Sequence, residues 1–188
     1  MKLILASGSP RRRELLAAAG VEFEVVVSPA EEIHDASIPL AELCERNAEL
    51  KAAAVAAEHP AAVVIGADTL VWIDGEPLGK PRNLAEARAM LRRLSGRAHT
   101  VCTGVCAIFP DGRIERFHEL TAVRFLPLDE ARIDAYLRRT DPLDKAGAYG
   151  IQDQAGLLVE DIAGSYTNVM GLPVERLRSV LQAWVAKV

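Results

Sequence analysis

Residues 62–73 read AVVIGADTLVWI, and this stretch decides the fold. Its first part, Ala62–Ala67, is the most apolar candidate for a buried strand in the chain. The polar pair Asp68-Thr69 follows, and Leu70–Ile73 continues the strand pattern. The next residues, Asp74-Gly75, are typical of a tight hairpin turn. We therefore predict a long strand that is buried at its start, carries a carboxylate in its middle and ends in a hairpin.

A strand, a tight loop and a helix open the chain. Leu3–Ala6 is a short apolar strand, Ser7–Pro10 is the loop, and Arg11–Ala19 has a helical pattern that ends at Gly20. Further helices are predicted at 41–57, 84–94, 129–139 and 173–185, and further strands at 21–27, 99–109, 113–125 and 157–162. Strands that alternate with helices, together with hairpins, predict an α/β fold with a mixed sheet and flanking helices.

Composition limits the class of protein. The 188 residues are 50% hydrophobic and 26% charged, which is typical of one globular domain that spans residues 1–188. No apolar run approaches the roughly 20 residues that cross a bilayer. The start, Met1–Leu5, predicts neither a signal peptide nor a transit peptide, so we expect a cytoplasmic protein.

Charge and cysteine content narrow the expected partners. The net charge of −4 argues against broad binding to nucleic acid or to an anionic membrane, so any anion site must be local. The three cysteines form no CxxC pair, which favours reduced thiols. Cys102 and Cys106 are spaced to face the same side of a strand, and we expect them to be buried rather than nucleophilic.

The segment Ser7–Arg13, SGSPRRR, holds the first candidate site. Ser9 is a favoured N-cap residue and Pro10 suits the first helical position. Three arginines then fall in the first turn, where the helix dipole disfavours each exposed cation by about 0.3 to 1 kcal/mol. A bound anion would reverse this penalty, because backbone amides, the dipole and guanidinium groups together bind phosphate. The segment indicates a phosphate site, and a solvated, arginine-rich turn is the alternative.

Carboxylates supply the second candidate site. Asp68 follows a buried run, and an acid at such a position in an α/β sheet is often catalytic. It could bind Mg²⁺ or take a proton from an attacking water, or it could only cap a turn. Glu31-Glu32 could add metal ligands, or could be solvated surface.

Lysines are rare in this chain, which has 17 arginines and five lysines. Three of the lysines, Lys51, Lys80 and Lys145, lie in unusual local sequences, where a compact ammonium would suit a triphosphate. Chance is the alternative explanation. Near Lys145, the Gly- and Ala-rich segment 144–150 predicts a pocket wall, with Gln152 able to read a base edge, or else an ordered connector.

Taken together, these segments resemble the Maf family of nucleoside triphosphate pyrophosphatases. The resemblance runs from Leu3 to about Pro173. It rests on segments in family order: Ser7–Arg12 (SGSPRR), Gly66–Thr69 (GADT), Leu78–Pro81 (LGKP), Ser95-Gly96 with His99 and Thr103, and Gly164–Pro173 (GSYTNVMGLP). The resemblance implies a mixed α/β fold related to inosine triphosphate pyrophosphatases, two lobes around a deep cleft, and a homodimer.

Carried over by motif, the resemblance implies a role for each candidate residue. Asp68 is the expected catalytic acid–base residue, and Asp68 and Glu32 are the expected ligands of a divalent cation, Mg²⁺ or Mn²⁺. The expected substrate-binding residues are Ser7, Arg11, Arg12, Lys51, Lys80, Thr69 and Gln152. The segment 144–152, DKAGAYGIQ, is similar to the branch that acts on dTTP and UTP, in which the positions of Arg12, Thr69 and Gln152 are associated with specificity.

We therefore expect an enzyme that hydrolyses nucleoside triphosphates, dTTP and UTP above all, to the monophosphate and pyrophosphate. Water, activated by Asp68 and the metal, would attack the α-phosphorus. One alternative is the same reaction on 7-methyl-GTP or another modified nucleotide. The other is a nucleotide-binding regulator, for instance of cell division, although a pure binder would not need a carboxylate that faces an anionic ligand.

Overall fold

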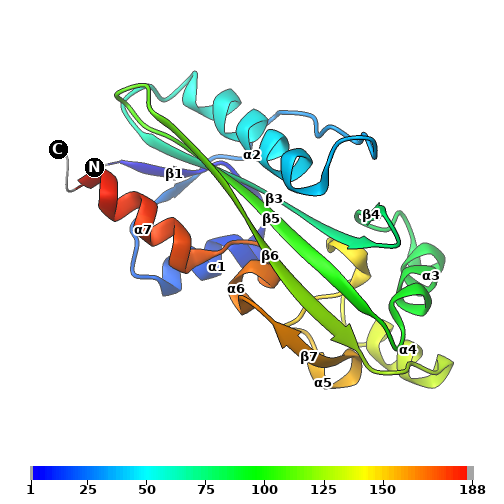
Figure 1. Ribbon diagram of the computed structural model, residues 1–188. Coiled ribbons are helices and arrows are strands. Elements are labelled where there is room, and N and C mark those ends of the chain that lie inside the picture. Colours follow the sequence, from blue (N-terminus) through cyan, green and yellow to red (C-terminus); the bar gives the residue numbers. More distant parts are fainter. Residues whose placement is uncertain (1, 186–188) are drawn as a thin grey trace. The chain divides into compact units, whose positions relative to one another are not determined.

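The computed structural model describes residues 2–185 and joins the strands of that range in one seven-stranded sheet (Figure 1). The strand order is β2-β1-β3-β5-β6-β7, and β4 pairs with β3. Pairing is parallel between β1 and β2 and between β1 and β3, and antiparallel between β3 and β4 and between β6 and β7. The predicted mixed sheet is therefore confirmed. The strands are β1 (Leu3–Leu5), β2 (Glu24–Val25), β3 (Val63–Ile73), β4 (Glu76–Leu78), β5 (Ala98–Ile108), β6 (Ile114–Phe125) and β7 (Val159–Ala163).

The predicted helices are present, with ends that differ from the prediction by at most two residues. Helix α3 has the predicted bounds, and Asn83 caps its start by accepting a hydrogen bond from the Glu86 amide at 2.9 Å. Among the described helices, none has the length and apolar character needed to cross a bilayer. The helices are α1 (Pro10–Ala18), α2 (Leu40–Ala56), α3 (Leu84–Leu94), α4 (Glu130–Leu137), α5 (Ala155–Leu158), α6 (Tyr166–Met170) and α7 (Val174–Val185), with a short 3₁₀ helix η1 at Ala146–Ala148.

Both predicted hairpins are present. Asp74 and Gly75 join β3 to β4 with φ of 57° and 80°, as the tightest hairpin turns require. At the turn between β5 and β6, the Phe109 amide donates to the Arg113 carbonyl at 2.9 Å. Gly112 has a φ of 83° in this turn, which explains a glycine there.

Three short elements differ from the prediction. Strand β2 covers two residues of the predicted 21–27, because only Glu24 and Val25 pair with β1. Helix α5 occupies the start of the predicted strand 157–162, so β7 begins only at Val159. Helix α6 lies in the predicted polar turn. Near the start of this helix, the backbone N–H of Asn168 donates to Ser165 Oγ at 3.1 Å.

The chain forms two compact units. The first contains the residues up to Asp68, Thr103–Glu119 and the residues from Gly171 onward. The second contains Thr69–Cys102 and Leu120–Met170. Strands β3, β5 and β6 each contribute residues to both units.

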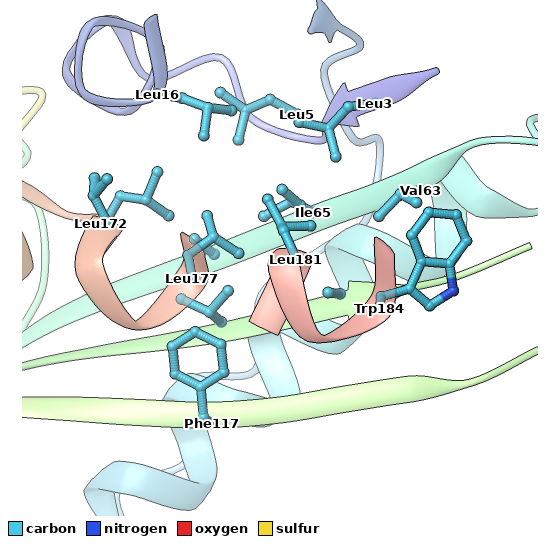
Figure 2. Packing of buried hydrophobic residues seen from close by; sticks show 14 of the residues in the cluster. Leu3, Leu5, Leu16, Val63, Ile65, Phe117, Leu172, Leu177, Leu181 and Trp184 are labelled. Atoms are coloured by element: carbon cyan, nitrogen blue, oxygen red, sulfur yellow. The ribbon is translucent and has the colours of Figure 1, made fainter. Parts of the chain in front are cut away.

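Strands of the first unit are covered by helices on both faces (Figure 1). Side chains of β1 alternate, so that Leu3 and Leu5 belong to one buried cluster and Ile4 to another. The first cluster includes residues of α1 and α7, and Figure 2 shows Leu177, Leu181 and Trp184 packed with Val63 and Ile65. The second cluster includes Ala48, Ala52 and Val55 of α2. Helix α2 is thereby fixed against the sheet.

The second unit has a core of its own. Side chains of α3 and α4, including Leu91 and Ile133, pack there with the aromatic pair Phe125 and Tyr149. Cys102 lies in this unit and Cys106 in the first, and both thiols are buried, as predicted. Burial raises the pKa of the Cys106 thiol to about 12, so this group stays protonated at neutral pH.

Candidate active site

Asp68 is a buried carboxylate in β3, directly after the apolar run Val63–Ala67. Only 4% of the residue is exposed. Its Oδ1 accepts a hydrogen bond from Lys51 Nζ at 2.7 Å, and its Oδ2 accepts one from Asn47 Nδ2 at 3.1 Å. Each carboxylate oxygen therefore has a partner, which offsets the cost of burying this charge.

Helix α2 brings both partners to Asp68. Asn47 and Lys51 are four residues apart and so lie on the same face of the helix. The helix backbone comes very close to the sheet, because a Cβ atom on Gly66 would lie 2.2 Å from the Ala48 carbonyl oxygen. Any larger residue at Gly66 would push α2 away from β3 and from Asp68.

Lys51 links Asp68 to a second carboxylate. Its Nζ lies 2.7 Å from Glu32 Oε1 as well as 2.7 Å from Asp68 Oδ1. Only 12% of the Lys51 side chain is exposed, so the ion pairs are partly shielded from water. Glu32 is exposed and lies outside regular secondary structure, between β2 and α2. The structure thus places the two predicted metal ligands on either side of an ammonium group.

Asn47 anchors the segment that carries Glu32. Its Oδ1 accepts from the Ile33 amide at 2.7 Å, and its Nδ2 donates to the Ile33 carbonyl at 3.1 Å. Asn47 was not among the predicted site residues. A single amide in the middle of an alanine-rich helix has no sequence signal of function, and its partners lie far away along the chain.

Arg12 is a cation of the first unit that is held by Ser7 and by a backbone carbonyl. Arg12 Nη1 donates to Ser7 Oγ at 3.1 Å, and its Nε donates to the Gly171 carbonyl at 2.7 Å. Burial lowers the pKa of the Arg12 guanidinium, while the charges of Asp68 and Glu32 act in the opposite direction. Arg12 therefore lies within electrostatic range of both carboxylates.

The first turn of α1 has the predicted arginines. The helix begins at Pro10 after the N-cap Ser9, as expected, and no acidic residue occupies this fully described first turn. The Ser9 side chain makes no capping hydrogen bond within the described residues, while its amide donates to Ser7 Oγ at 3.3 Å. Arg11 is half-buried and close enough to lower the pKa of Arg12. The positive helix end and these guanidinium groups together favour an anion.

The other three predicted substrate residues belong to the second unit. Thr69 follows Asp68 in β3 and is half-buried, Lys80 is exposed after β4, and Gln152 is exposed in the segment after η1. Lys145 shapes the Gln152 segment, because its buried Nζ lies 2.7 Å from Asp144 Oδ1 and 3.2 Å from Asp153 Oδ2.

Two solved structures share this fold at low sequence identity. The Ham1 protein of Staphylococcus aureus has a TM-score of 0.57 and 16% identity, over 97% of this chain and 99% of that one. A HAM1 protein of Coxiella burnetii has a TM-score of 0.55 and 13% identity, over 97% and 99% of the two chains. At these identities the likeness concerns the fold alone, and it agrees with the predicted fold class.

Curated relatives match the sequence far more closely. A protein of Akkermansia muciniphila is 48% identical over 179 residues, which is 95% of this chain and 94% of the relative. A protein of Symbiobacterium thermophilum is 50% identical over 180 residues, which is 96% of this chain and 92% of the relative. A protein of Bacillus mycoides is 51% identical over 176 residues, which is 94% of this chain and 92% of the relative. All three are named dTTP/UTP pyrophosphatase. A family model described as Maf-like protein matches residues 2–184. The chain therefore belongs to the Maf family.

Proposed function

We propose that this chain hydrolyses nucleoside triphosphates, with dTTP and UTP as the best substrates, to the nucleoside monophosphate and pyrophosphate. One observation supports the proposal most strongly: the buried carboxylate of Asp68 is paired with the Lys51 ammonium at 2.7 Å, and its charge raises the pKa of the Arg12 guanidinium. Such a site combines a proton acceptor with cationic groups that stabilise a charged transition state. The relatives named dTTP/UTP pyrophosphatase suggest the nucleotide class.

In the proposed reaction, water attacks the α-phosphorus and the bond to the oxygen that bridges the α- and β-phosphorus breaks. Asp68 accepts the proton of the attacking water. Pyrophosphate leaves as an anion, whose charge is balanced by Arg11, Arg12 and the first turn of α1, with Ser7 as a further phosphate ligand. Lys51 holds the Asp68 carboxylate and contacts the phosphates, and Lys80 is proposed as another phosphate ligand.

A divalent cation, Mg²⁺ or Mn²⁺, is part of the proposal. Residues 2–185 contain no group of three or more His, Cys, Asp or Glu side chains that could hold a metal on their own. Two carboxylates nevertheless fit the ion, because Mg²⁺ is commonly held by one or two carboxylates together with water and substrate phosphates. Lys51 contacts Glu32 Oε1 and Asp68 Oδ1. The ion would therefore bind Glu32 Oε2 and the second lone pair of Asp68 Oδ2, whose first lone pair accepts from Asn47. When bound, the cation would neutralise charge on the phosphates.

The test is pyrophosphate release from dTTP, UTP, CTP, dCTP, GTP and 7-methyl-GTP, with Mg²⁺ or Mn²⁺, for the wild type and Asp68→Asn. We expect turnover of dTTP and UTP that falls by about 10²- to 10⁴-fold in the variant, because the amide cannot accept the proton. Asp111→Asn is the matched control, since Asp111 is exposed in the turn between β5 and β6. Wild-type turnover in Asp68→Asn would contradict the role of Asp68.

The same panel separates the alternatives. Base selection is proposed to rest on Arg12, Thr69 and Gln152, since the Gln152 amide can both donate and accept a hydrogen bond. Preference for 7-methyl-GTP or another base would keep the reaction and overturn this assignment. Binding of nucleotides without release of pyrophosphate would favour a regulator, for instance of cell division.

The domain organisation, the oligomeric state and the cellular compartment of the enzyme are further parts of the proposal. We propose that residues 1–188 act as one pyrophosphatase domain, that two copies form a homodimer, and that the enzyme works in the cytoplasm on free nucleotides rather than on nucleic acid or membranes. Sedimentation equilibrium of the whole chain tests the dimer, and a mass of one chain across the micromolar range would contradict it.

A further inference from the structure

The side chain of Asn47 is buried in the middle of α2, and 2% of the residue is exposed. A buried amide is costly unless its polar atoms are paired. Here Oδ1 accepts from the Ile33 amide, and Nδ2 donates to the Ile33 carbonyl and to Asp68 Oδ2. The Ile33 carbonyl and Asp68 Oδ2 act as acceptors, which fixes the orientation of the amide.

These bonds connect two segments that both reach Lys51. Ile33 follows Glu32, whose Oε1 is paired with Lys51 Nζ, and Asp68 Oδ1 is paired with the same nitrogen. Asn47 therefore holds the backbone beside one carboxylate and, by its other amide hydrogen, the second carboxylate itself. The contacts form a closed loop through Asn47, Ile33-Glu32, Lys51 and Asp68.

We propose that Asn47 is a positioning residue, which holds Asp68 and the Glu32 segment in the arrangement that the reaction needs. The inference rests on the proposed function, because it assumes that Asp68 accepts the proton. Asn47 itself acts through Asp68 and does not touch the reacting atoms. Its loss would leave Asp68 with Lys51 as a partner on one oxygen and would free the carboxylate to rotate about its side chain.

The test uses two variants of the whole chain. Asn47→Leu removes all three hydrogen bonds at similar volume, and Asn47→Asp keeps an acceptor for the Ile33 amide but removes the donor to Asp68. We expect kcat for dTTP to fall by about 10- to 100-fold in both, the usual effect of losing a residue that orients a catalytic group. KM should change by less than about threefold, because the phosphate ligands remain in place.

Val55→Ala is the matched control. Val55 is buried on the same helix, two turns further along, and packs in the second cluster of the first unit. This variant lowers the stability of α2 packing without touching Asp68, so kcat should stay close to wild type. Thermal unfolding, followed by circular dichroism, is measured for every variant.

The outcomes are distinct. If Asp68→Asn is inactive while both Asn47 variants keep wild-type kcat, the positioning role is wrong and the proposed function stands. If the wild type releases no pyrophosphate from any nucleotide, the proposed function and this inference fall together. If both Asn47 variants are unfolded at 25 °C while Val55→Ala is folded, or if KM rises as much as kcat falls, Asn47 serves the fold or substrate binding and the inference is wrong.

Discussion

His99 is a buried histidine among aromatic side chains in the second unit. Its Nε2 lies 2.7 Å from the Tyr149 hydroxyl, and its ring packs edge-on against Phe125 at 5.0 Å between centroids. Its Nδ1 is buried without a hydrogen-bond partner among the described residues, so a proton there would be uncompensated. Burial lowers the pKa of His99 to about 4. Because the unfolded chain then binds more protons between about pH 6.5 and pH 4, folding stability falls as the pH falls through this window.

We expect this single group to reduce the free energy of unfolding by about 2 to 3 kcal/mol between about pH 7 and pH 4.5. Urea unfolding at the two pH values measures the change for the wild type and for His99→Gln, which cannot titrate. The variant should show a smaller pH dependence by that amount, and His34→Gln, at an exposed position, should behave as the wild type. An unchanged pH dependence in His99→Gln would rule out this assignment.

Part of the candidate active site could be predicted from the types of residue in the sequence. Asp68 and the arginines of α1 stand out in the sequence because a carboxylate after a buried strand and cations at a helix start are both unfavourable without a partner. The direct pairing of Lys51 with Asp68 and Glu32 could not be predicted, because it depends on where α2 lies on the sheet. Asn47 has no comparable signal, since its partners lie 14 and 21 residues away.

At the scale of elements, helix α2 depends on two glycines of the sheet. Gly66 of β3 lies under Ala48, and Gly104 of β5 lies under Cys44, where a Cβ atom would come within 2.3 Å of the Cys44 carbonyl carbon. The contacted atoms belong to the helix backbone, which cannot move aside without shifting α2. This explains why two strands that are rich in β-branched and apolar residues contain glycine at these positions.

We therefore expect Gly104→Ala to displace α2, to lower the free energy of unfolding by at least about 2 kcal/mol and to lower kcat for dTTP. The loss of kcat follows because α2 carries Asn47 and Lys51, which both contact Asp68. Chemical denaturation and pyrophosphate release measure the two effects. Gly156→Ala is the control, since nothing lies within 4 Å of a Cβ atom there. Equal stability of Gly104→Ala and the wild type would contradict this account of the packing.

The sequence predicts an element well when the signal is local. Helix α3 has its N-cap directly before it and its apolar face within its own residues, and the hairpin at Asp74 needs only its turn pair. Strand β2 has two residues, whose extent is set by parallel pairing with β1 rather than by their own pattern. Leu157-Leu158 suits a buried strand as well as a short helix, so periodicity could not decide between them.

At the scale of the whole molecule, each unit has its own buried clusters, but the units share strands. Strands β3, β5 and β6 cross from one unit into the other, at the steps from Asp68 to Thr69, Cys102 to Thr103 and Glu119 to Leu120. If one unit unfolds, these three strands lose pairing partners along part of their length, and the same strands continue into the other unit. A single cooperative transition should result, despite the separate cores.

The two tryptophans make this testable, because Trp184 of α7 lies in the first unit and Trp72 of β3 lies in the second. In Trp72→Phe, fluorescence reports only Trp184, which is buried and stacks on Phe109 at 5.3 Å between centroids. In Trp184→Phe, it reports only Trp72, and the loss of the stacked indole should lower the urea midpoint. Within each variant, however, fluorescence and far-ultraviolet circular dichroism should give the same midpoint. A fluorescence transition that precedes the loss of secondary structure in either variant would show that the units unfold separately, and the shared strands would then not couple them.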